Sequence, residues 1–240
     1  MRQRADRLLV ERGLFESRAK AQAAIAAGSV HADGAPVRKG SDLISTAATL
    51  AAAPAHPWVS RGGVKLAAAL DRSGFDPKDG VCLDVGASTG GFTEVLLARG
   101  ARRIYAVDVG TGQLHPSLHQ RPEVARLEQT DIRKLGALPE PPGFVTVDVS
   151  FISLIQVLPA VAALAAPAHK LLALIKPQFE AGRAHLKKGI VRDPAVQAAV
   201  CERVAAQARE LGYTVAAVFP SPIAGGDGNA EFFIAAARER

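Results

Sequence analysis

The chain has 240 residues, of which 48% are hydrophobic and 22% are charged, a balance that excludes a wholly disordered or collagen-like protein. This length predicts one or two domains. Lysines and arginines outnumber the acids by 29 to 23, a formal net charge of +6 that favours a polyanionic partner only weakly. Cys82 and Cys201 form no C-x-x-C motif, so they predict neither a disulfide scaffold nor a zinc ribbon and fit a reducing cytosol.

The sequence predicts a cytoplasmic protein that is neither secreted nor embedded in a membrane. The first twelve residues carry basic side chains but no apolar core of signal-peptide length. The longest apolar run, 157–168, contains two prolines and falls short of the roughly 20 residues that a membrane-spanning helix needs.

Residues 1–45 predict a small, separate α+β domain. A helix over 5–13 and a helix over 18–27, with Ser17 as N-cap, precede a hairpin whose turn is Asp33-Gly34. The domain carries eight Lys and Arg residues against five Asp and Glu, which suits contacts with nucleic-acid phosphates or an ordinary solvated surface. The candidate RNA contacts in this domain are Arg4, Arg7, Arg18 and Lys20.

Residues 46–59 are rich in Ala and Pro and predict an end strand followed by a linker. Over residues 60–240, strand-like apolar runs alternate with helix-like runs, which predicts an α/β domain with a mostly parallel sheet covered on both faces. The last two strands leave no room for a helix between them, so the final strand should be antiparallel. The expected strands are 81–85, 104–109, 125–129, 144–149, 170–175, 213–219 and 231–237, and the expected helices are 64–72, 92–99, 154–164 and 194–211.

A glycine-rich loop follows the first of these strands, where open parallel sheets bind their ligands. Its G-x-x-x-G-G spacing differs from the G-x-G-x-x-G of dinucleotide sites, which weakens a nicotinamide interpretation. Asp108 ends the second strand and can take both hydroxyls of a ribose, while Asp131 follows the third and can reach an adenine amino group. The alternative is a tight turn with helix-capping acids. The set resembles the S-adenosylmethionine site of class I methyltransferases, with candidate cofactor contacts at Asp84, Gly86, Ala87, Ser88, Gly90, Gly91, Phe92, Asp108, Asp131 and Asp148.

Four charged residues are expected at this same edge of the sheet. Asp148 and Lys176 end the fourth and fifth strands, Glu231 begins the antiparallel last strand, and Lys65 opens the helix before the first. Singly each fits a surface ion pair, but two lysines in apolar strand-end contexts with two acids at the same depth favour a reaction centre. A ribose 2′-hydroxyl is a poor nucleophile, so such a centre must position it and help remove its proton. Lys176 fits the general base, our preferred role, or a charge that stabilises the oxyanion. Lys65 and Asp148 are then expected to hold and tune Lys176, and Glu231 to orient Lys65 or the hydroxyl.

These four residues match, in order and context, the Lys-Asp-Lys-Glu tetrad of the FtsJ-like ribose 2′-O-methyltransferases. Segments 60–66, 148–154 and 176–183 are similar to the TlyA family, and the N-terminal domain resembles an S4-type RNA-binding domain, so the likeness covers nearly the whole chain. The resemblance implies S-adenosylmethionine as cofactor and cytidine 2′-hydroxyls of ribosomal RNA as acceptor. The implied catalytic residues are Lys65, Asp148, Lys176 and Glu231.

A basic stretch directly after Lys176 predicts a loop that grips phosphates beside the target nucleotide, or a solvated loop. Phe92, Phe151 and Phe179 are expected to pack in the core rather than to stack on bases. His115 and His119 have no acid to complete a set, so no metal site is predicted. The further RNA-contact candidates are Arg61, Arg183, Lys187 and Lys188.

Other classes of function fit the sequence less well. The fourth strand is followed by Asp-Val-Ser-Phe, not by the Asn/Asp-Pro-Pro-Tyr/Phe that base-amino methyltransferases carry. A non-catalytic RNA-binding or ribosome-assembly protein remains an alternative, although the tetrad is complete. A nicotinamide-dependent dehydrogenase has the wrong glycine spacing. The TlyA family also carries a haemolysin label, for which the chain offers no apolar or strongly amphipathic segment.

Overall fold

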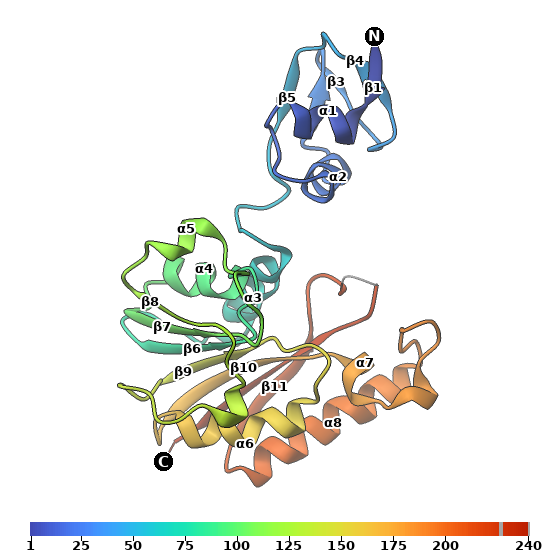
Figure 1. The fold of residues 1–240 in the computed structure, drawn as a ribbon. Coiled ribbons are helices and arrows are strands. Elements are labelled where there is room, and N and C mark those ends of the chain that lie inside the picture. Colours follow the sequence, from blue (N-terminus) through green and yellow to red (C-terminus); the bar gives the residue numbers. More distant parts are fainter. Residues whose placement is uncertain (226–227, 240) are drawn as a thin grey trace. The chain divides into compact units, whose positions relative to one another are not determined.

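The computed structural model describes residues 1–225 and 228–239, so positions 226, 227 and 240 of the expected domain 60–240 lie outside the described residues. The chain divides into two compact units, Met1–Pro57 and Trp58–Arg240, each with a hydrophobic core of its own. Figure 1 shows the elements of both units.

The first unit is an α+β fold whose local signals act as the sequence predicts. Ser17 caps the second helix by accepting a hydrogen bond from the Lys20 backbone N–H at 3.3 Å. Asp33 and Gly34 both have positive φ, 49° and 79°, as a two-residue hairpin turn requires. The elements are β1 (Arg2–Arg4), α1 (Ala5–Glu11), α2 (Arg18–Ala26), β2 (Val30–Ala32), β3 (Ala35–Pro36), β4 (Leu43–Ser45) and β5 (Leu50–Ala52).

The boundary of this unit differs from the one expected at residue 45. Strand β5 pairs antiparallel with β2, with Val30 opposite Ala52, so residues 46–52 belong to the first unit and not to a linker. Strands β1 and β4, which pair with each other, were not predicted. Each has only three residues, too few to show the alternation by which a strand is recognised in a sequence.

The second unit is built on a seven-stranded sheet in the order β11-β12-β10-β9-β6-β7-β8. Strand β12 runs antiparallel to both of its neighbours, and the other pairs are parallel. All seven strands were predicted, with bounds within two residues. They are β6 (Val81–Val85), β7 (Arg103–Val107), β8 (Val124–Leu127), β9 (Phe144–Val147), β10 (His169–Ile175), β11 (Thr214–Pro220) and β12 (Phe232–Arg238).

Helices cover both faces of this sheet (Figure 1). The apolar core under α3 (Arg61–Ser73) and α4 (Gly91–Ala98) includes Phe233. The opposite core, under α6 (Leu154–Leu164) and α8 (Pro194–Glu210), includes the next residue, Ile234, so successive side chains of β12 serve opposite faces. None of the helices in the described ranges is long and apolar enough to cross a membrane. Four short elements were not predicted: α5 (Pro116–His119), η1 (Ile132–Lys134), α7 (Pro177–Glu180) and η2 (Arg183–His185).

The register of the sheet brings four strand termini to one edge. Val147, the last residue of β9, lies opposite Val85 at the end of β6. Ile175, the last residue of β10, lies opposite Phe232, the first residue of β12. The residues that follow β6, β9 and β10 and the residue that precedes β12 therefore meet at the same edge.

Candidate active site

The glycine loop after β6 is shaped by backbone conformations that favour glycine. Gly86 has φ of 83°, and a Cβ on it would lie 2.4 Å from the carbonyl oxygen of Asp148. Because real Cβ atoms do not approach so closely, a side chain here would push the ends of β6 and β9 apart. Ser88 also lies in the left-handed region, with φ of 47°, which turns its backbone N–H toward the neighbouring strand end.

Asp108, which follows β7, closes this loop from the side. Its Oδ2 accepts a hydrogen bond from the Ser88 backbone N–H at 2.8 Å, and its Oδ1 accepts one from the Gly110 backbone N–H at 2.7 Å. A carboxylate offers about four acceptor positions, so two remain for other donors. The position and the spare acceptors fit the expected contact with two ribose hydroxyls.

A cavity of about 360 Å³ lies over this edge of the sheet, between the loops that follow β6, β7, β8 and β9. Asp131 lies in its wall as an ion pair with Arg133, with N and O atoms 2.6 Å apart. Hydrogen bonds from the Arg133 guanidinium lower the pKa of Asp131 to about 2. Five of the expected cofactor contacts line this cavity: Gly86, Ser88, Asp108, Asp131 and Asp148. Apolar neighbours that the sequence did not single out complete its wall, among them Val109, Ile132, Val149 and Ile152.

Asp84 and Gly90 differ from the other expected cofactor contacts, because neither lines the two cavities at this edge. The Asp84 side chain is fully buried and accepts hydrogen bonds from the hydroxyls of Thr93, at 2.6 Å, and Thr146, at 3.0 Å. Burial raises the pKa of Asp84 to about 7. Gly90 packs against Leu118, whose Cδ1 would lie 2.2 Å from a Cβ. Both residues support the glycine loop from behind.

The four expected charged residues form two ion pairs. Lys65 Nζ donates a hydrogen bond to Glu231 Oε2 at 2.6 Å, with both side chains buried. Lys176 Nζ lies 2.7 Å from Asp148 Oδ1 and donates a hydrogen bond to Ser150 Oγ at 2.9 Å. Despite that short distance, Asp148 Oδ1 has no aligned hydrogen-bond donor among the described residues. In the first pair the lysine donates a hydrogen bond to its carboxylate. In the second, the lysine lies close to its carboxylate but donates its hydrogen bond to Ser150.

The two pairs face the same small cavity of about 120 Å³, which Lys65 and Asp148 both line. Gly86, Ser88 and Asp148 line this cavity and the larger one, so the charged cluster adjoins the cavity over the glycine loop. The other expected contacts in the wall of the small cavity are Ala87, Gly91 and Phe92, and Ser60, Gly62 and Thr89 are additions.

The prediction that Phe151 packs in the core is wrong. Its side chain is 90% exposed and its φ is 65°, a conformation that is strained for a bulky residue. It lies in the wall of the larger cavity, and its ring centroid is 5.0 Å from that of Phe179. Phe92, in contrast, is buried and stacks on Phe233 as a core residue. The sequence placed Phe151, like Phe179, close to the expected site but did not predict that its ring is exposed, because exposure depends on the loop that carries the ring.

The candidate RNA contacts of the first unit differ in how firmly they are held. Arg4 and Arg18 both bind the carboxylate of the fully buried Asp6, each with a closest distance of 2.9 Å, and hydrogen bonds from Arg4 and Arg18 lower the pKa of Asp6 well below its usual range. Lys20 pairs with Glu16 at the surface. Arg7 is exposed.

In the second unit, the two lysine candidates sit on a tight hairpin. Lys187 and Ile190 form an antiparallel bridge around Lys188 and Gly189, both of which have positive φ. Asn229, which the sequence did not single out, is buried and fixes this hairpin: it accepts from the Val191 backbone N–H at 3.1 Å and donates to the Gly189 carbonyl at 3.0 Å. The remaining candidates, Arg61 and Arg183, are exposed, and Arg61 donates to the carbonyl of Ala224.

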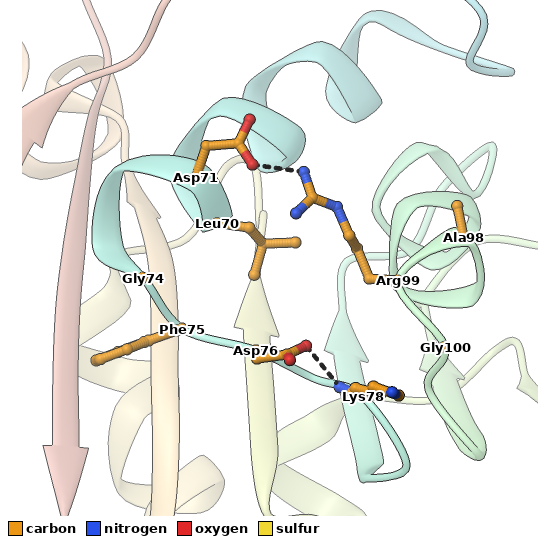
Figure 2. Close-up of a pocket in the computed structure, with 9 residues that line it drawn as sticks. All are labelled: Leu70, Asp71, Gly74, Phe75, Asp76, Lys78, Ala98, Arg99 and Gly100. Atoms are coloured by element: carbon orange, nitrogen blue, oxygen red, sulfur yellow. Dashed lines mark hydrogen bonds and ion pairs between the residues drawn. The ribbon is translucent and has the colours of Figure 1, made fainter.

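A larger depression of about 620 Å³ lies elsewhere, at the C-terminal ends of α3 and α4 (Figure 2). Figure 2 shows that its two carboxylates already have partners: Asp71 pairs with Arg99, and Asp76 accepts from the Lys78 backbone N–H. We therefore assign the chemistry to the smaller cavities at the strand ends. No group of three or more His, Cys, Asp or Glu is arranged to hold a metal ion within residues 1–225 and 228–239.

Comparisons with known proteins agree with this geometry. A family model described as FtsJ-like methyltransferase matches residues 58–238. The chain is 45% identical over 240 residues to the 16S/23S rRNA (cytidine-2′-O)-methyltransferase TlyA of Mycobacterium tuberculosis, a match that covers 97% of this chain and 89% of that protein. A solved structure from Streptococcus thermophilus, titled as a candidate hemolysin, matches with TM-score 0.78 at 40% identity and covers 99% of this chain and 89% of its own.

A more distant structure places the fold in a wider class. The N-methyltransferase NodS of Bradyrhizobium japonicum, solved with S-adenosyl-L-homocysteine, matches with TM-score 0.54 at 15% identity and covers 75% of this chain and 86% of its own. The mostly parallel sheet with an antiparallel last strand confirms the expected class I methyltransferase fold. The family match over residues 58–238 and the identity over nearly the whole chain show that this protein belongs to the FtsJ-like methyltransferase family.

Proposed function

We propose that this protein methylates the 2′-hydroxyl of cytidines in ribosomal RNA, with S-adenosylmethionine as the methyl donor. The observation that carries the proposal is the pair of buried lysine–carboxylate contacts around a small cavity that adjoins the glycine-loop cavity. A relative with 45% identity is named for this reaction on 16S and 23S rRNA. Ribosomal RNA as substrate also implies the cytoplasm as the compartment.

The larger cavity fits S-adenosylmethionine in the chemistry of its wall. Asp108 keeps two acceptor positions for ribose hydroxyls. Ile132 offers an apolar surface to an adenine ring, and Asp131 beside it, which accepts four hydrogen bonds from Arg133, can take the adenine amino group only by giving up part of that ion pair. Gly86 leaves the backbone open where a Cβ would collide with the neighbouring strand end. The cofactor supplies an activated methyl group, and every other requirement of the reaction falls to side chains of this chain.

The two lysines are suited to different parts of the reaction. Lys65 donates a hydrogen bond to the buried carboxylate of Glu231 and lines the small cavity, which fits it to stabilise negative charge on the attacking oxygen. Lys176 donates to the neutral Ser150 hydroxyl, and its contact with Asp148 is close but not aligned. We assign Nζ of Lys176, which directly follows β10 and contacts both Asp148 and Ser150, to accept the proton of the 2′-hydroxyl.

Phe151 fits the base of the acceptor nucleotide. An exposed aromatic ring at the rim of the cavity offers a stacking surface, and stacking of a base on an aromatic side chain contributes about 1–3 kcal/mol. A target nucleotide that leaves its helix to reach the small cavity loses stacking with its neighbours. The Phe151 ring would replace part of that loss.

The first unit fits a docking role on RNA, as the resemblance to an S4-type domain implies. Arg4 and Arg18 share one buried carboxylate, so the cluster has an excess of positive charge with two guanidiniums already oriented. Guanidiniums bind phosphates with paired hydrogen bonds. We infer that this unit binds the phosphate backbone of ribosomal RNA, in free rRNA or in ribosomal subunits.

The test is methyl transfer to ribosomal RNA that lacks the modification, with digestion to nucleosides and mass spectrometry. The expected product is 2′-O-methylcytidine. A matched RNA with 2′-deoxycytidine at the modified position should bind but accept no methyl group. A methyl group found on a base contradicts the proposal, as does RNA binding without transfer, which would favour a non-catalytic assembly protein. Lysis of erythrocytes without methyl transfer would favour the haemolysin label.

A further inference from the structure

The short helix α7 directly follows Lys176 and contacts the β9–α6 loop, residues 148–154, at three places. Lys176 contacts Asp148 and Ser150. The Phe179 ring packs against Phe151. Positions 176, 179 and 180 are spaced i, i+3 and i+4, so all three lie on one face of this helical turn.

Glu180 makes the third contact and fixes the far end of the loop. Its Oε2 accepts from the Ser153 hydroxyl at 2.6 Å, and its Oε1 accepts from the Leu154 backbone N–H at 2.7 Å. The side chain is buried, which strengthens both hydrogen bonds. The Arg203 guanidinium donates to the backbone carbonyl of Glu180, so the backbone that carries this side chain is itself held from α8.

Two side chains cap the first turn of α6, and one of them comes from another segment. Ser153 already caps α6 by accepting from the Ile155 backbone N–H at 3.2 Å. Glu180 takes a further backbone donor of that first turn and ties the cap to the segment of Lys176. The loop is therefore held at its start by Lys176 and at its end by Glu180, and Phe151, with its positive φ, lies between the two attachments.

A bulky residue keeps a left-handed backbone only where its surroundings hold it there. Without Glu180, the end of the loop at Ser153 would lose its attachment to α7, and Phe151 could return to an extended backbone. Ser150 and Asp148, which contact Lys176, lie in the same short loop. The buried carboxylate of Glu180 thus affects both the position of the exposed Phe151 ring and the residues that contact Lys176.

We propose that Glu180 is a positioning residue, which holds the 148–154 loop in the conformation that receives the acceptor nucleotide. The proposal rests on the proposed function, because it assigns the loop to the RNA acceptor. Glu180 acts through Ser153 and Leu154 and does not touch the reacting atoms.

The experiment compares Glu180→Ala, Glu180→Gln and a matched control, Asp193→Ala. Asp193 caps α8 through a carboxylate that accepts from the Ala195 backbone N–H at 2.9 Å, so its loss removes a comparable cap away from the loop. Glu180→Ala should lower kcat/KM for RNA at least tenfold. Glu180→Gln keeps an oxygen for the Leu154 N–H and should recover to within about threefold of wild type, and Asp193→Ala should stay within twofold.

A double-mutant cycle with Phe151→Ala separates positioning from general destabilisation. If Glu180 acts through the loop, the double variant should be no more than about twofold worse than the poorer single variant, because the ring is already lost. Effects that multiply would overturn the proposal. If Glu180→Ala does not fold, as judged by circular dichroism, Ser153→Ala takes its place in the cycle, with at least a threefold loss of kcat/KM expected.

Hydrogen–deuterium exchange gives a readout that does not depend on activity. Glu180→Ala should speed exchange of the amides in 149–155 at least tenfold and leave the first turn of α8 unchanged. Unchanged exchange in 149–155, or kcat/KM within twofold of wild type in a folded Glu180→Ala protein, overturns the positioning role. If the wild-type protein transfers no methyl group to RNA, the proposed function fails, and the exchange result alone decides whether Glu180 holds the loop.

Discussion

The two regions of the candidate site are formed by different kinds of contact. We call the cavity over the glycine loop the cofactor half and the cluster of Lys65, Glu231, Lys176 and Asp148 the acceptor half. Around the glycine loop, the wall depends on backbone: Gly86 and Ser88 have positive φ, and backbone N–H groups bind Asp108. On the acceptor side, the contacts are between side chains from distant segments, such as Lys65 with Glu231. Substitutions that add a side chain should therefore disrupt the cofactor half most. Substitutions that remove a charge should disrupt the acceptor half most.

The two halves also treat buried charge differently. The acceptor half satisfies its carboxylates with lysines. The cofactor half buries Asp84 with two hydroxyls as its partners, and burial raises the pKa of that carboxyl to about 7. Hydroxyls stabilise a buried carboxylate less than a cation does. The support beneath the glycine loop should therefore depend on pH.

The largest expected effect is the loss of activity in Lys176→Ala. Removal of general-base help reduces rates by about 10² to 10⁴. Because Lys176 lines neither of the cavities at the sheet edge, affinity for S-adenosylhomocysteine, measured by calorimetry, should stay within about threefold of wild type. Single-turnover methyl transfer gives the rate.

Lys65→Ala provides the matched comparison. Its ion pair is the more buried of the two, and its loss leaves Glu231 as a buried, unpaired carboxylate, so this variant should lose stability as well as activity.

If Lys176→Ala lowered cofactor affinity as much as it lowered the rate, the division into cofactor and acceptor halves would be wrong.

The next effect concerns the pH dependence of stability through Asp84. Because the folded state holds this proton more tightly than the unfolded state, the stabilisation is complete below about pH 4 and is lost as the pH rises toward 7. Each unit of difference corresponds to about 1.4 kcal/mol, so the free energy of unfolding of wild type, relative to Asp84→Asn, should fall by about 3 kcal/mol between pH 5 and pH 8.

Urea unfolding of both proteins at pH 5, 6, 7 and 8 measures this difference directly. Asn cannot ionise and keeps one oxygen for a threonine hydroxyl, so it isolates the titration from the packing. Parallel curves for the two proteins over this range would show that the Asp84 carboxyl has an ordinary pKa in the folded state.

The sequence predicted the cofactor half more completely than the acceptor half, and the reason is physical. A positive φ favours glycine, so the loop from Gly86 can be recognised in the sequence by its glycines. A strand followed by such a loop shows at which edge of the sheet the ligand binds. The four charged residues could also be placed at that edge, because each lies next to a strand end. The expectation for Glu231 left open whether it orients Lys65 or the acceptor hydroxyl, because that choice depends on side-chain directions across four segments; in the structure Glu231 pairs with Lys65.

Other parts of the site had no local signal. Phe151 is exposed because Lys176 and Glu180 hold the two ends of its loop, and neither contact is visible in the order of residues. Asn229 stands in a run of small residues and resembles any loop asparagine, yet it is buried against the lysine hairpin. Asp84 was expected to contact the cofactor because it lies one residue before the end of a strand, but alternation along β6 turns it under α4 toward Thr93.

A smaller effect is expected for Asp108→Ala. Removal of a charged hydrogen-bond partner costs about 1–3 kcal/mol, which corresponds to a 5- to 150-fold weaker affinity for S-adenosylhomocysteine. The rate at saturating cofactor should fall much less than in Lys176→Ala, since Asp108 belongs to the cofactor half. Unchanged affinity in a folded Asp108→Ala protein would contradict the placement of the ribose.

The smallest effect extends the comparison to the first unit, where Arg4 and Arg18 are held by a buried acid much as Lys65 is held by Glu231. An oriented guanidinium loses less side-chain entropy on binding a phosphate than a free one. Arg18→Gln should therefore weaken RNA binding by less than about tenfold at physiological salt. It should also reduce the slope of the logarithm of the RNA-binding constant against the logarithm of the salt concentration by about 0.7–0.9, the value for one phosphate contact. Arg7→Gln, which removes an exposed arginine, should change both quantities less. Equal effects of the two substitutions, measured by filter binding at several salt concentrations, would show that orientation by Asp6 contributes nothing to docking.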